Sequence, residues 1–174
     1  AQVAENIFEI VYHLNQALDR IDDPRERITL AGHNLTAAIQ AKNSSAYPSA
    51  RKYLYKAMGL LTENCWAENY DLTLAIHNEH CELGYLTGDH ETAGRYFNAI
   101  ASHAKTPIDK VKAYETRIIM LSASNQLTQA IMLGIEALKS LGMTFPQKVS
   151  KIDIFRGLVQ VGWLMRKKSP DDLV

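Results

Sequence analysis

The sequence has few of the residues that interrupt regular secondary structure. Only 5 prolines and 9 glycines are spread over 174 residues, 47% of which are hydrophobic and 22% charged. This composition is that of a globular protein and argues against extended disorder. A chain of this length buries roughly 70% of the surface that it exposes when unfolded, so it needs neither a disulfide nor a metal to fold.

Charge of one sign and long apolar runs are also missing. Nineteen basic residues balance 19 acidic ones, so no overall field favours nucleic acid or an anionic membrane. The two cysteines, Cys65 and Cys81, have no disulfide or metal-site spacing, and the apolar runs are far shorter than the ~20 residues that cross a bilayer. We therefore expect no nucleic-acid partner, no membrane insertion and a cytoplasmic location.

The two ends of the sequence lack features of a complete protein. It does not begin with methionine or with a signal-like segment, and it stops at Leu173-Val174 without an obvious closing element. We expect it to be a segment of a longer protein.

The stretch from Leu72 to Ala104 is the clearest structural unit. Apolar residues recur every three or four positions in both of its halves, which is typical of amphipathic helices. Between the halves, Gly88 can end one helix and Asp89 can cap the next. The stretch predicts a helical hairpin, with Leu72, Ala75, Ile76, Leu83 and Leu86 on one apolar face and Ala93, Tyr96, Phe97, Ile100, Ala101 and Ala104 on the other.

The same periodicity predicts helices on both sides of this hairpin. A first helix runs from Ile7 to Ile21, and Asp23, Pro24 and Glu26 then form the start of a second, with a capping box. A third helix spans 50–60. Nothing resembles an alternating strand, so we predict an all-α fold of about eight helices.

Further helices are predicted after Ala104. Thr106 and Pro107 are suited to begin a helix that carries Ile108, Val111 and Tyr114 and continues to about Ala123. Asn125-Gln126 forms a bend before a helix that contains Ala130 and ends at Gly142. The last predicted helix is capped by Ser150, has Phe155, Leu158, Val159, Gly162 and Met165 as its apolar stripe and ends in the basic run Arg166-Lys167-Lys168.

Three of these helices share a pattern of small and large residues. Ala50-Leu54-Ala57, Ala93-Phe97-Ile100 and Ala130-Gly134-Ala137 align at intervals of about 40 residues, and a regular period of this kind indicates a helical repeat. The pattern resembles the tetratricopeptide repeat, in which small residues lie where two helices cross. By this alignment Cys81 takes the place of the crossing glycine in the central copy.

The repeat resemblance implies a right-handed superhelix of stacked antiparallel helical hairpins. Each hairpin alone leaves apolar surface that its neighbour covers. We divide the chain into a leading helix at 1–22, which could end a preceding domain, three tetratricopeptide-like hairpins at 23–146, and a truncated C-terminal helix at 147–174.

A wider set of apolar and aromatic positions resembles the helical region of very large bacterial signalling proteins. In that family a serine/threonine kinase and a P-loop ATPase precede the region, and a sensor domain and a histidine kinase follow it. The resemblance implies an interdomain scaffold without an active site, whose partners are flanking domains of the same chain. It covers about residues 1–146 and rests on Leu14-Asn15, Leu30-Ala31, Asn34-Leu35, Ala38, Ala41, Ala46-Tyr47, Ala50, Tyr53-Leu54, Leu60-Leu61, Trp66, Tyr70, Tyr85-Leu86, Gly88-Asp89 and Ala93.

Several residues could carry chemistry, but each has a simpler interpretation. His77 and Cys81 share a helix face, with His80 and His90 nearby. A tetrahedral metal site needs three or four convergent ligands, so packing is favoured over metal binding. The pair Trp66 and Tyr70 could anchor a partner, although packing between repeats is favoured.

Catalysis finds little support in the sequence. Phosphotransfer through His33 or His77 lacks the lysine or glycine that usually follows the reactive histidine. Glu79, Glu82 and Asp89 could transfer protons, but acids on amphipathic helices are usually solvated. The chain contains no phosphate-binding loop and no protein-kinase motif. We predict no catalytic residue, cofactor or metal.

The favoured function is recognition by a concave surface. The first helix of each hairpin would line that surface, and the repeat alignment assigns its polar positions to protein binding. The sequence therefore predicts a non-catalytic protein or interdomain interaction scaffold in a signal-transduction protein; the alternative is a helical phosphotransfer or small helical enzyme domain. The candidate protein-binding residues are Asn78, Glu82, Tyr85, Lys112 and Glu115.

Overall fold

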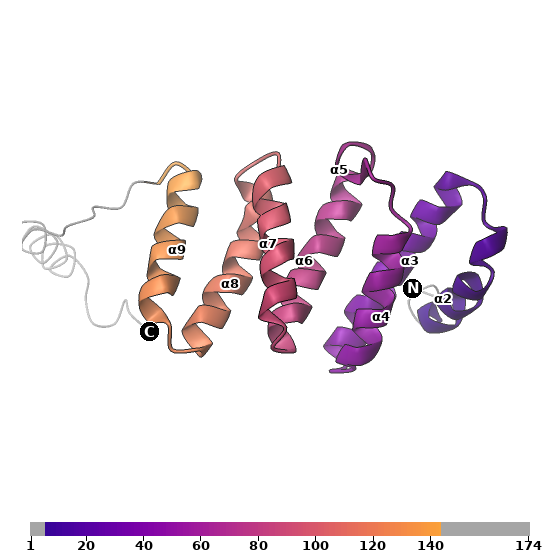
Figure 1. The fold of residues 1–174 in the computed structure, drawn as a ribbon, viewed down its shortest axis with the longest axis horizontal. Helices are drawn as coiled ribbons and strands as arrows, with labels where there is room; N and C mark the ends of the chain where they lie inside the picture. The colour runs from indigo at the N-terminus through magenta and orange to yellow at the C-terminus, as the bar shows by residue number, and fades with distance from the viewer. Residues whose placement is uncertain (1–5, 144–174) are drawn as a thin grey trace, which may run out of the picture.

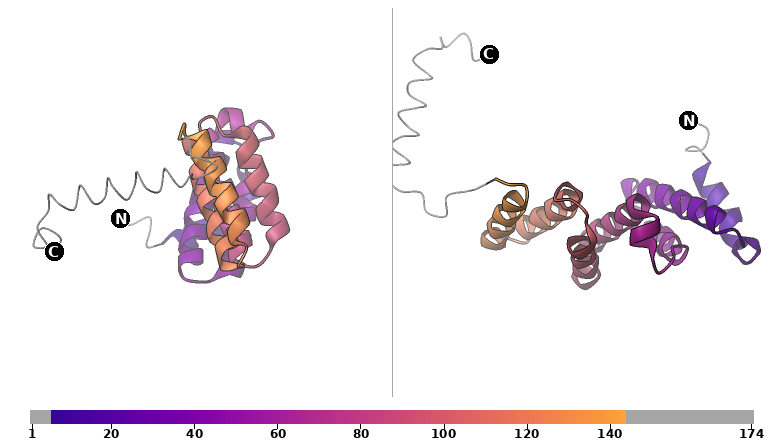
Figure 2. Two further views of the ribbon diagram at one scale, coloured as in Figure 1. Left: turned by 90° about the vertical axis from the view of Figure 1, so that its left-hand side faces the viewer. Right: turned by 90° about the horizontal axis from the view of Figure 1, so that it is seen from above.

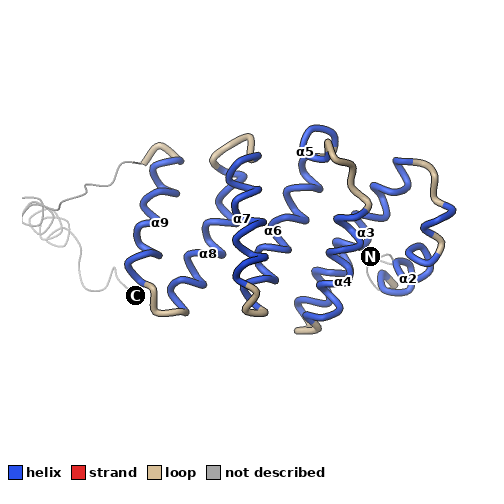
Figure 3. Tube along the Cα trace, viewed as in Figure 1, coloured by secondary structure: helices blue, strands red, loops and turns tan. Residues whose placement is uncertain are grey.

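The structure, a computed structural model, describes residues 6–143. These residues form eight α-helices and two short 3-10 helices, and no strand occurs among them (Figure 3). The predicted all-α fold class is confirmed. In chain order the elements are α2 (Ile7–Gln16), η1 (Leu18–Arg20), α3 (Pro24–Asn43), α4 (Tyr47–Gly59), α5 (Cys65–Glu68), α6 (Tyr70–Leu86), α7 (His90–His103), η2 (Ile108–Lys110), α8 (Val111–Ala123) and α9 (Leu127–Ser140).

The helices pack as consecutive hairpins, α3 with α4, α6 with α7, and α8 with α9. The hairpins follow one another along the long axis of the molecule (Figure 1), and Figure 2 shows the same row from one end and from above. Neighbouring hairpins meet where α4 and α8 each pack against α6. The predicted stacking of helical hairpins is confirmed, whereas the right-handed superhelix stays a prediction.

The turns of the second and third hairpins use residues that tolerate a left-handed backbone. Gly88 follows α6 with a φ of +73°, a conformation that costs glycine little. Asp89 then caps α7, because its Oδ1 accepts a hydrogen bond of 3.1 Å from the amide of Thr92. Asn125, with a φ of 59°, makes the bend between α8 and α9. Both turns were predicted from the sequence.

The capping interactions at the other helix starts differ in detail from the predicted ones. Asp23 caps α3 by accepting a hydrogen bond of 2.9 Å from the amide of Arg25, not through a reciprocal box with Glu26. A reciprocal pair does form before α8. There the Thr106 amide donates to Asp109 Oδ2 at 3.0 Å, and the Asp109 amide donates to Thr106 Oγ1 at 3.3 Å.

Small residues allow the helices of each hairpin to approach. Ala50, Ala93 and Ala130, which the sequence pattern aligns, are all buried. In the central hairpin the close approach lies at Gly84, where an added Cβ would lie 2.9 Å from the Ala93 Cβ. The placement of Cys81 at this crossing was therefore wrong, because only a residue without a side chain fits against Ala93. Cys81 instead lies in an apolar cluster with residues of α7 and α8.

One predicted helix boundary was also wrong, and one short helix was missed. The first helix ends at Gln16, and a separate 3-10 turn follows. Leu18 and Ile21 therefore pack from this connection against a cluster that contains Leu30 and Leu60. The short helix α5 was not predicted, since four residues are too few to show a 3.6-residue period.

Four residues assigned to apolar faces are exposed. Leu14 is 37%, Leu86 44%, Ile108 71% and Val111 41% exposed. The prediction applied one α-helical period from Ile108 onward. This segment instead begins with the 3-10 turn η2, which has three residues per turn and leaves Ile108 outside α8. Ala113 and Tyr114 are the buried residues of α8, so the predicted face is right at Tyr114 and wrong at Val111.

The predicted helix that carries Phe155 and Met165, and the basic run Arg166-Lys167-Lys168, lie outside the described residues. Within residues 6–143 no helix has both the length and the apolar character required to cross a membrane.

Candidate functional site

A cluster of four charged residues joins the first helices of the three hairpins. Glu79 of α6 is at its centre: its Oε2 lies 2.6 Å from Lys42 Nζ of α3, and its Oε1 lies 2.5 Å from Lys112 Nζ of α8. Glu82 completes the cluster, with its Oε2 2.7 Å from Lys42 Nζ and 3.7 Å from Lys112 Nζ. We call Lys42, Glu79, Glu82 and Lys112 the Glu79 cluster.

The Glu79 cluster is electrostatically balanced although part of it is buried. The side chain of Glu79 is 6% exposed, against 50% for Lys112. Burial alone would raise the pKa of Glu79, but the hydrogen bonds and charges of Lys112 and Lys42 lower it below its usual value. Burial opposes the charge of Lys42 in the same way, and Glu79 and Glu82 raise its pKa above its usual value. Glu79 and Lys42 therefore stay ionised, and the ion pairs of the cluster hold α3, α6 and α8 together.

The five candidate protein-binding residues lie on α6 and α8. Asn78, Glu82 and Tyr85 follow one another on one side of α6, and Lys112 and Glu115 occupy successive turns of α8. Lys112 and Glu82 belong to the Glu79 cluster, so both have internal partners. Glu115 is exposed to solvent.

Asn78 is the least accessible of the five. It is 7% exposed, and its amide donates a hydrogen bond of 3.0 Å to the carbonyl oxygen of Leu74. Its Oδ1 is buried without a hydrogen-bond partner. An unpaired buried acceptor costs free energy, but this atom is enclosed, so a partner protein cannot reach it without a local opening.

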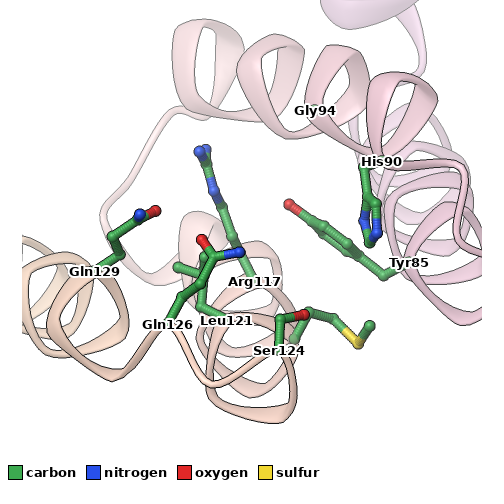
Figure 4. A pocket seen from close by; sticks show the side chains of 9 residues that line it. Tyr85, His90, Gly94, Arg117, Leu121, Ser124, Gln126 and Gln129 are labelled. Carbon is green, nitrogen blue, oxygen red and sulfur yellow. The ribbon is translucent and has the colours of Figure 1, made fainter.

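Tyr85 lines a cavity of about 360 Å³ between the second and third hairpins. Figure 4 shows Tyr85 of α6 and Arg117 of α8 pointing into the same space, with α7 on one side and the start of α9 on another. The lining residues are Tyr85, His90, Gly94, Arg117, Met120, Leu121, Ser124, Gln126 and Gln129.

The histidines weighed as metal ligands pack against aromatic rings, and His77 and His80 both contact Tyr96. His77 Nδ1 donates a hydrogen bond of 2.8 Å to the carbonyl oxygen of Thr73, and the centroid of its ring lies 4.7 Å from that of Trp66. His80 stacks on Tyr96, with ring centroids 4.2 Å apart. His90 lies beside Tyr85. In the part of the chain that the structure describes, no three His, Cys, Asp or Glu side chains could hold a metal ion together.

Burial also decides the chemistry of His80 and Cys81. His80 is 3% exposed; burial lowers its pKa to about 4, although a hydrogen bond to the backbone of Leu54 opposes this effect. Burial raises the pKa of the Cys81 thiol to about 12. The imidazole is therefore neutral and the thiol protonated near pH 7, so neither acts as a base or nucleophile in this environment.

The remaining candidates have structural contacts. Tyr70 donates a hydrogen bond of 2.7 Å to Asp109 Oδ2 and accepts one of 2.7 Å from the Lys105 amide, which ties α6 to η2. Trp66 packs against His103 with ring centroids 5.0 Å apart. Asp89, besides capping α7, lies 3.8 Å from Arg51. Within the proton-transfer set, Glu79 and Glu82 are paired with lysines. His33, the other phosphotransfer candidate, is half-buried on α3.

Sequence reasoning missed two features of this region, the central position of Glu79 and the cavity around Arg117. One signal for Glu79 was available. His77, Asn78, Glu79 and His80 are four consecutive polar residues in a helix that is covered by hairpins on both sides, so at least one had to be buried and paired. No local pattern indicated Arg117, because its surroundings come from three other helices.

Comparison with known proteins gives one informative similarity. The chain is 24% identical over 147 residues to the hybrid signal transduction histidine kinase G of Dictyostelium discoideum; the match covers 79% of this chain and 4% of that protein. No family model matches the chain, and no solved structure matches it.

This similarity supports a segment of a signal-transduction protein. The chain spans only 4% of the length of that relative, so the match says nothing of which activity the segment has. The relative comes from a eukaryote, and neither a bacterial origin nor membership of a repeat family gains support from it.

Proposed function

We propose that the chain is a non-catalytic interaction module of a signal-transduction protein, which binds a flanking segment of its own polypeptide across α6 and α8. The proposal rests on the similarity to a signalling histidine kinase and on the arrangement of charged residues on the first helices of the hairpins.

The Glu79 cluster is the observation that carries the proposal. Lys42 and Lys112 belong to different hairpins and both contact Glu79 of the central one. These contacts fix α3, α6 and α8 relative to one another, so the hairpins offer one preformed surface. A preformed surface loses little conformational entropy on binding. At its solvent side lie Glu115 and the half-exposed Lys112, whose charges can select a partner by complementarity.

The test measures binding of the two immediately flanking segments of the full-length protein to this chain by calorimetry. Glu115 is exposed and has no ion-pair partner in the described part of the chain, so Glu115→Lys reverses a surface charge without disturbing the fold. We expect it to weaken binding roughly fivefold or more. Glu91→Lys, at an exposed position of α7, is the matched control and should bind normally.

Unchanged affinity of the E115K variant, or no affinity for either flanking segment, would contradict the proposal. The phosphotransfer alternative makes a different prediction. His77 is enclosed by aromatic rings, which leaves His33 as the accessible candidate. Acid-labile label on His33 after incubation with a phosphorylated receiver domain would replace the interaction module with a phosphotransfer domain.

A further inference from the structure

The cavity between the second and third hairpins has an unbalanced charge. Arg117 is the one guanidinium or ammonium group among its nine lining residues, and none of the nine is a carboxylate. The ion pairs within residues 6–143 are formed by Lys42, Arg51 and Lys112, and none of them involves Arg117. No carboxylate of the described residues therefore forms an ion pair with Arg117.

Arg117 is held in place without being paired. Its guanidinium carbon lies 4.5 Å from the centroid of the Phe97 ring, a cation–π contact that engages the flat face of the group. A planar guanidinium supported in this way keeps the N–H groups of its edge available, and those groups match the two oxygens of a carboxylate.

Neutral hydrogen-bond donors surround the guanidinium. Tyr85 lies on α6, Gln126 directly precedes α9 and Gln129 lies in its first turn. Figure 4 shows the hydroxyl of Tyr85 and the amide of Gln126 directed into the space beside Arg117. Leu121 and Met120 supply apolar wall. A few convergent polar groups in a partly apolar cavity of about 360 Å³ are typical of ligand sites, which occupy roughly 300–1,000 Å³.

We propose that this cavity binds an aspartate or glutamate side chain of an acidic peptide segment, with Arg117 as the ion-pair partner and Tyr85 and Gln126 as hydrogen-bond donors. The inference rests on the proposed interaction function and names the chemistry of the partner. A single cation matches the single negative charge of a carboxylate, whereas a phosphate dianion is usually bound by a cluster of cations.

The test is an NMR titration of the 174-residue chain with N-acetyl-glutamate N-methylamide, followed through the side-chain amides of Gln126 and Gln129. The matched ligand is N-acetyl-glutamine N-methylamide, which has the same shape without the charge. We expect saturable shifts with the glutamate derivative and affinity at least about tenfold weaker for the glutamine derivative.

Protein variants assign the effect to Arg117. R117Q should lower the affinity for the glutamate derivative about tenfold or more. R117K keeps the positive charge and should retain part of this affinity. R95Q removes an exposed cation of α7 that lies outside the cavity, so it should bind like the parent protein. Thermal melting of each variant confirms that it is folded.

Three results would overturn the inference: equal affinity for both derivatives, full affinity of a folded R117Q variant, or tighter binding of N-acetyl-phosphoserine N-methylamide. The titration needs no natural partner. If the glutamate derivative binds and the flanking segments do not, the proposed function fails while the carboxylate site stands. If a flanking segment binds and the glutamate derivative does not, the interaction function stands and the carboxylate site is refuted.

Discussion

Lys42 Nζ lies 2.6 Å from Glu79 Oε2, although 37 positions separate the two residues. The contact crosses from the first hairpin to the second, and Lys112 repeats it from the third hairpin. Ion pairs at a surface contribute little to stability, but removal of one partner from a buried pair leaves an uncompensated charge. The Glu79 cluster therefore couples the stability of each hairpin to the presence of its neighbours.

Glu79→Gln is expected to destabilise the fold. The change leaves Lys42, whose side chain is 11% exposed, with Glu82 as its remaining carboxylate. We expect a loss of about 1–3 kcal/mol in the free energy of unfolding, measured by urea denaturation. Glu115→Gln is the control, and a change within roughly 0.5 kcal/mol is expected because Glu115 is exposed. Equal effects of the two variants on the free energy of unfolding would show that the buried ion pairs of Glu79 do not stabilise the fold.

Replacing both members of the pair should be less harmful than replacing one. The double variant K42M/E79L removes the two buried charges together and substitutes apolar groups of similar length. We expect it to be at least about 1 kcal/mol more stable than E79L alone. Urea denaturation of both variants provides the comparison. If the double variant is the less stable of the two, burial of an uncompensated Lys42 is not the source of the cost.

His80 should make stability depend on pH between about 4 and 6.5. Burial lowers its folded-state pKa from the usual 6.5 to about 4. The unfolded chain therefore binds more protons in this interval, and stability falls as the pH is lowered through it. The full effect is on the order of 3 kcal/mol. His80→Gln should reduce the slope of the free energy of unfolding against pH between pH 7 and 5. Carboxylates contribute least to the slope in this interval.

The exposed His90 supplies the control for this experiment. The slope should change more in His80→Gln than in His90→Gln, because burial lowers the pKa of His80. His77 has a pKa lowered by burial too, so a reduced slope is expected to remain in the His80→Gln variant. An H80Q slope equal to that of the parent protein would mean that folding does not lower the pKa of His80.

Gly84→Ala should weaken the contact between α6 and α7. The added Cβ would lie 2.9 Å from both the backbone nitrogen and the Cβ of Ala93, and a backbone atom cannot move aside cheaply. We expect a loss of about 1–3 kcal/mol. Gly32→Ala, in α3, has no atom within 4 Å of the new Cβ and should stabilise by roughly 0.5–1 kcal/mol. Thermal melting of the two variants distinguishes the cases, and a stabilising G84A would refute the close approach.

Local chemistry and periodicity explain which parts of the fold the sequence predicts. Gly88 and Asp89 form a turn by themselves, and Ala50 and Ala93 mark crossings because small residues are required there. The 3-10 turn before Val111 was not predicted, because a single α-helical period was applied from Ile108 onward.

The candidate site was less predictable than the hairpins. Asn78 and Glu82 lie on α6 as expected. The alignment predicted which face of the helix they occupy but not how deeply their side chains are buried. How far each is buried depends on the neighbouring hairpins, which supply Lys42 and Lys112 from positions distant in the sequence. The cavity at Arg117 combines residues of four helices; no pattern within one helix contains that information.

Cys81 should be protected from thiol reagents. It is fully buried, and burial raises the pKa of its thiol to about 12, so both access and ionisation are disfavoured. In a C65S background at pH 8, we expect native Cys81 to react with an aromatic disulfide reagent at least about 100-fold more slowly than in the unfolded chain. An E91C substitution in the same background adds an exposed thiol and should add one fast phase. Reaction of native Cys81 at the rate of that fast phase would place the thiol at the surface and remove it from the cluster that joins α6, α7 and α8.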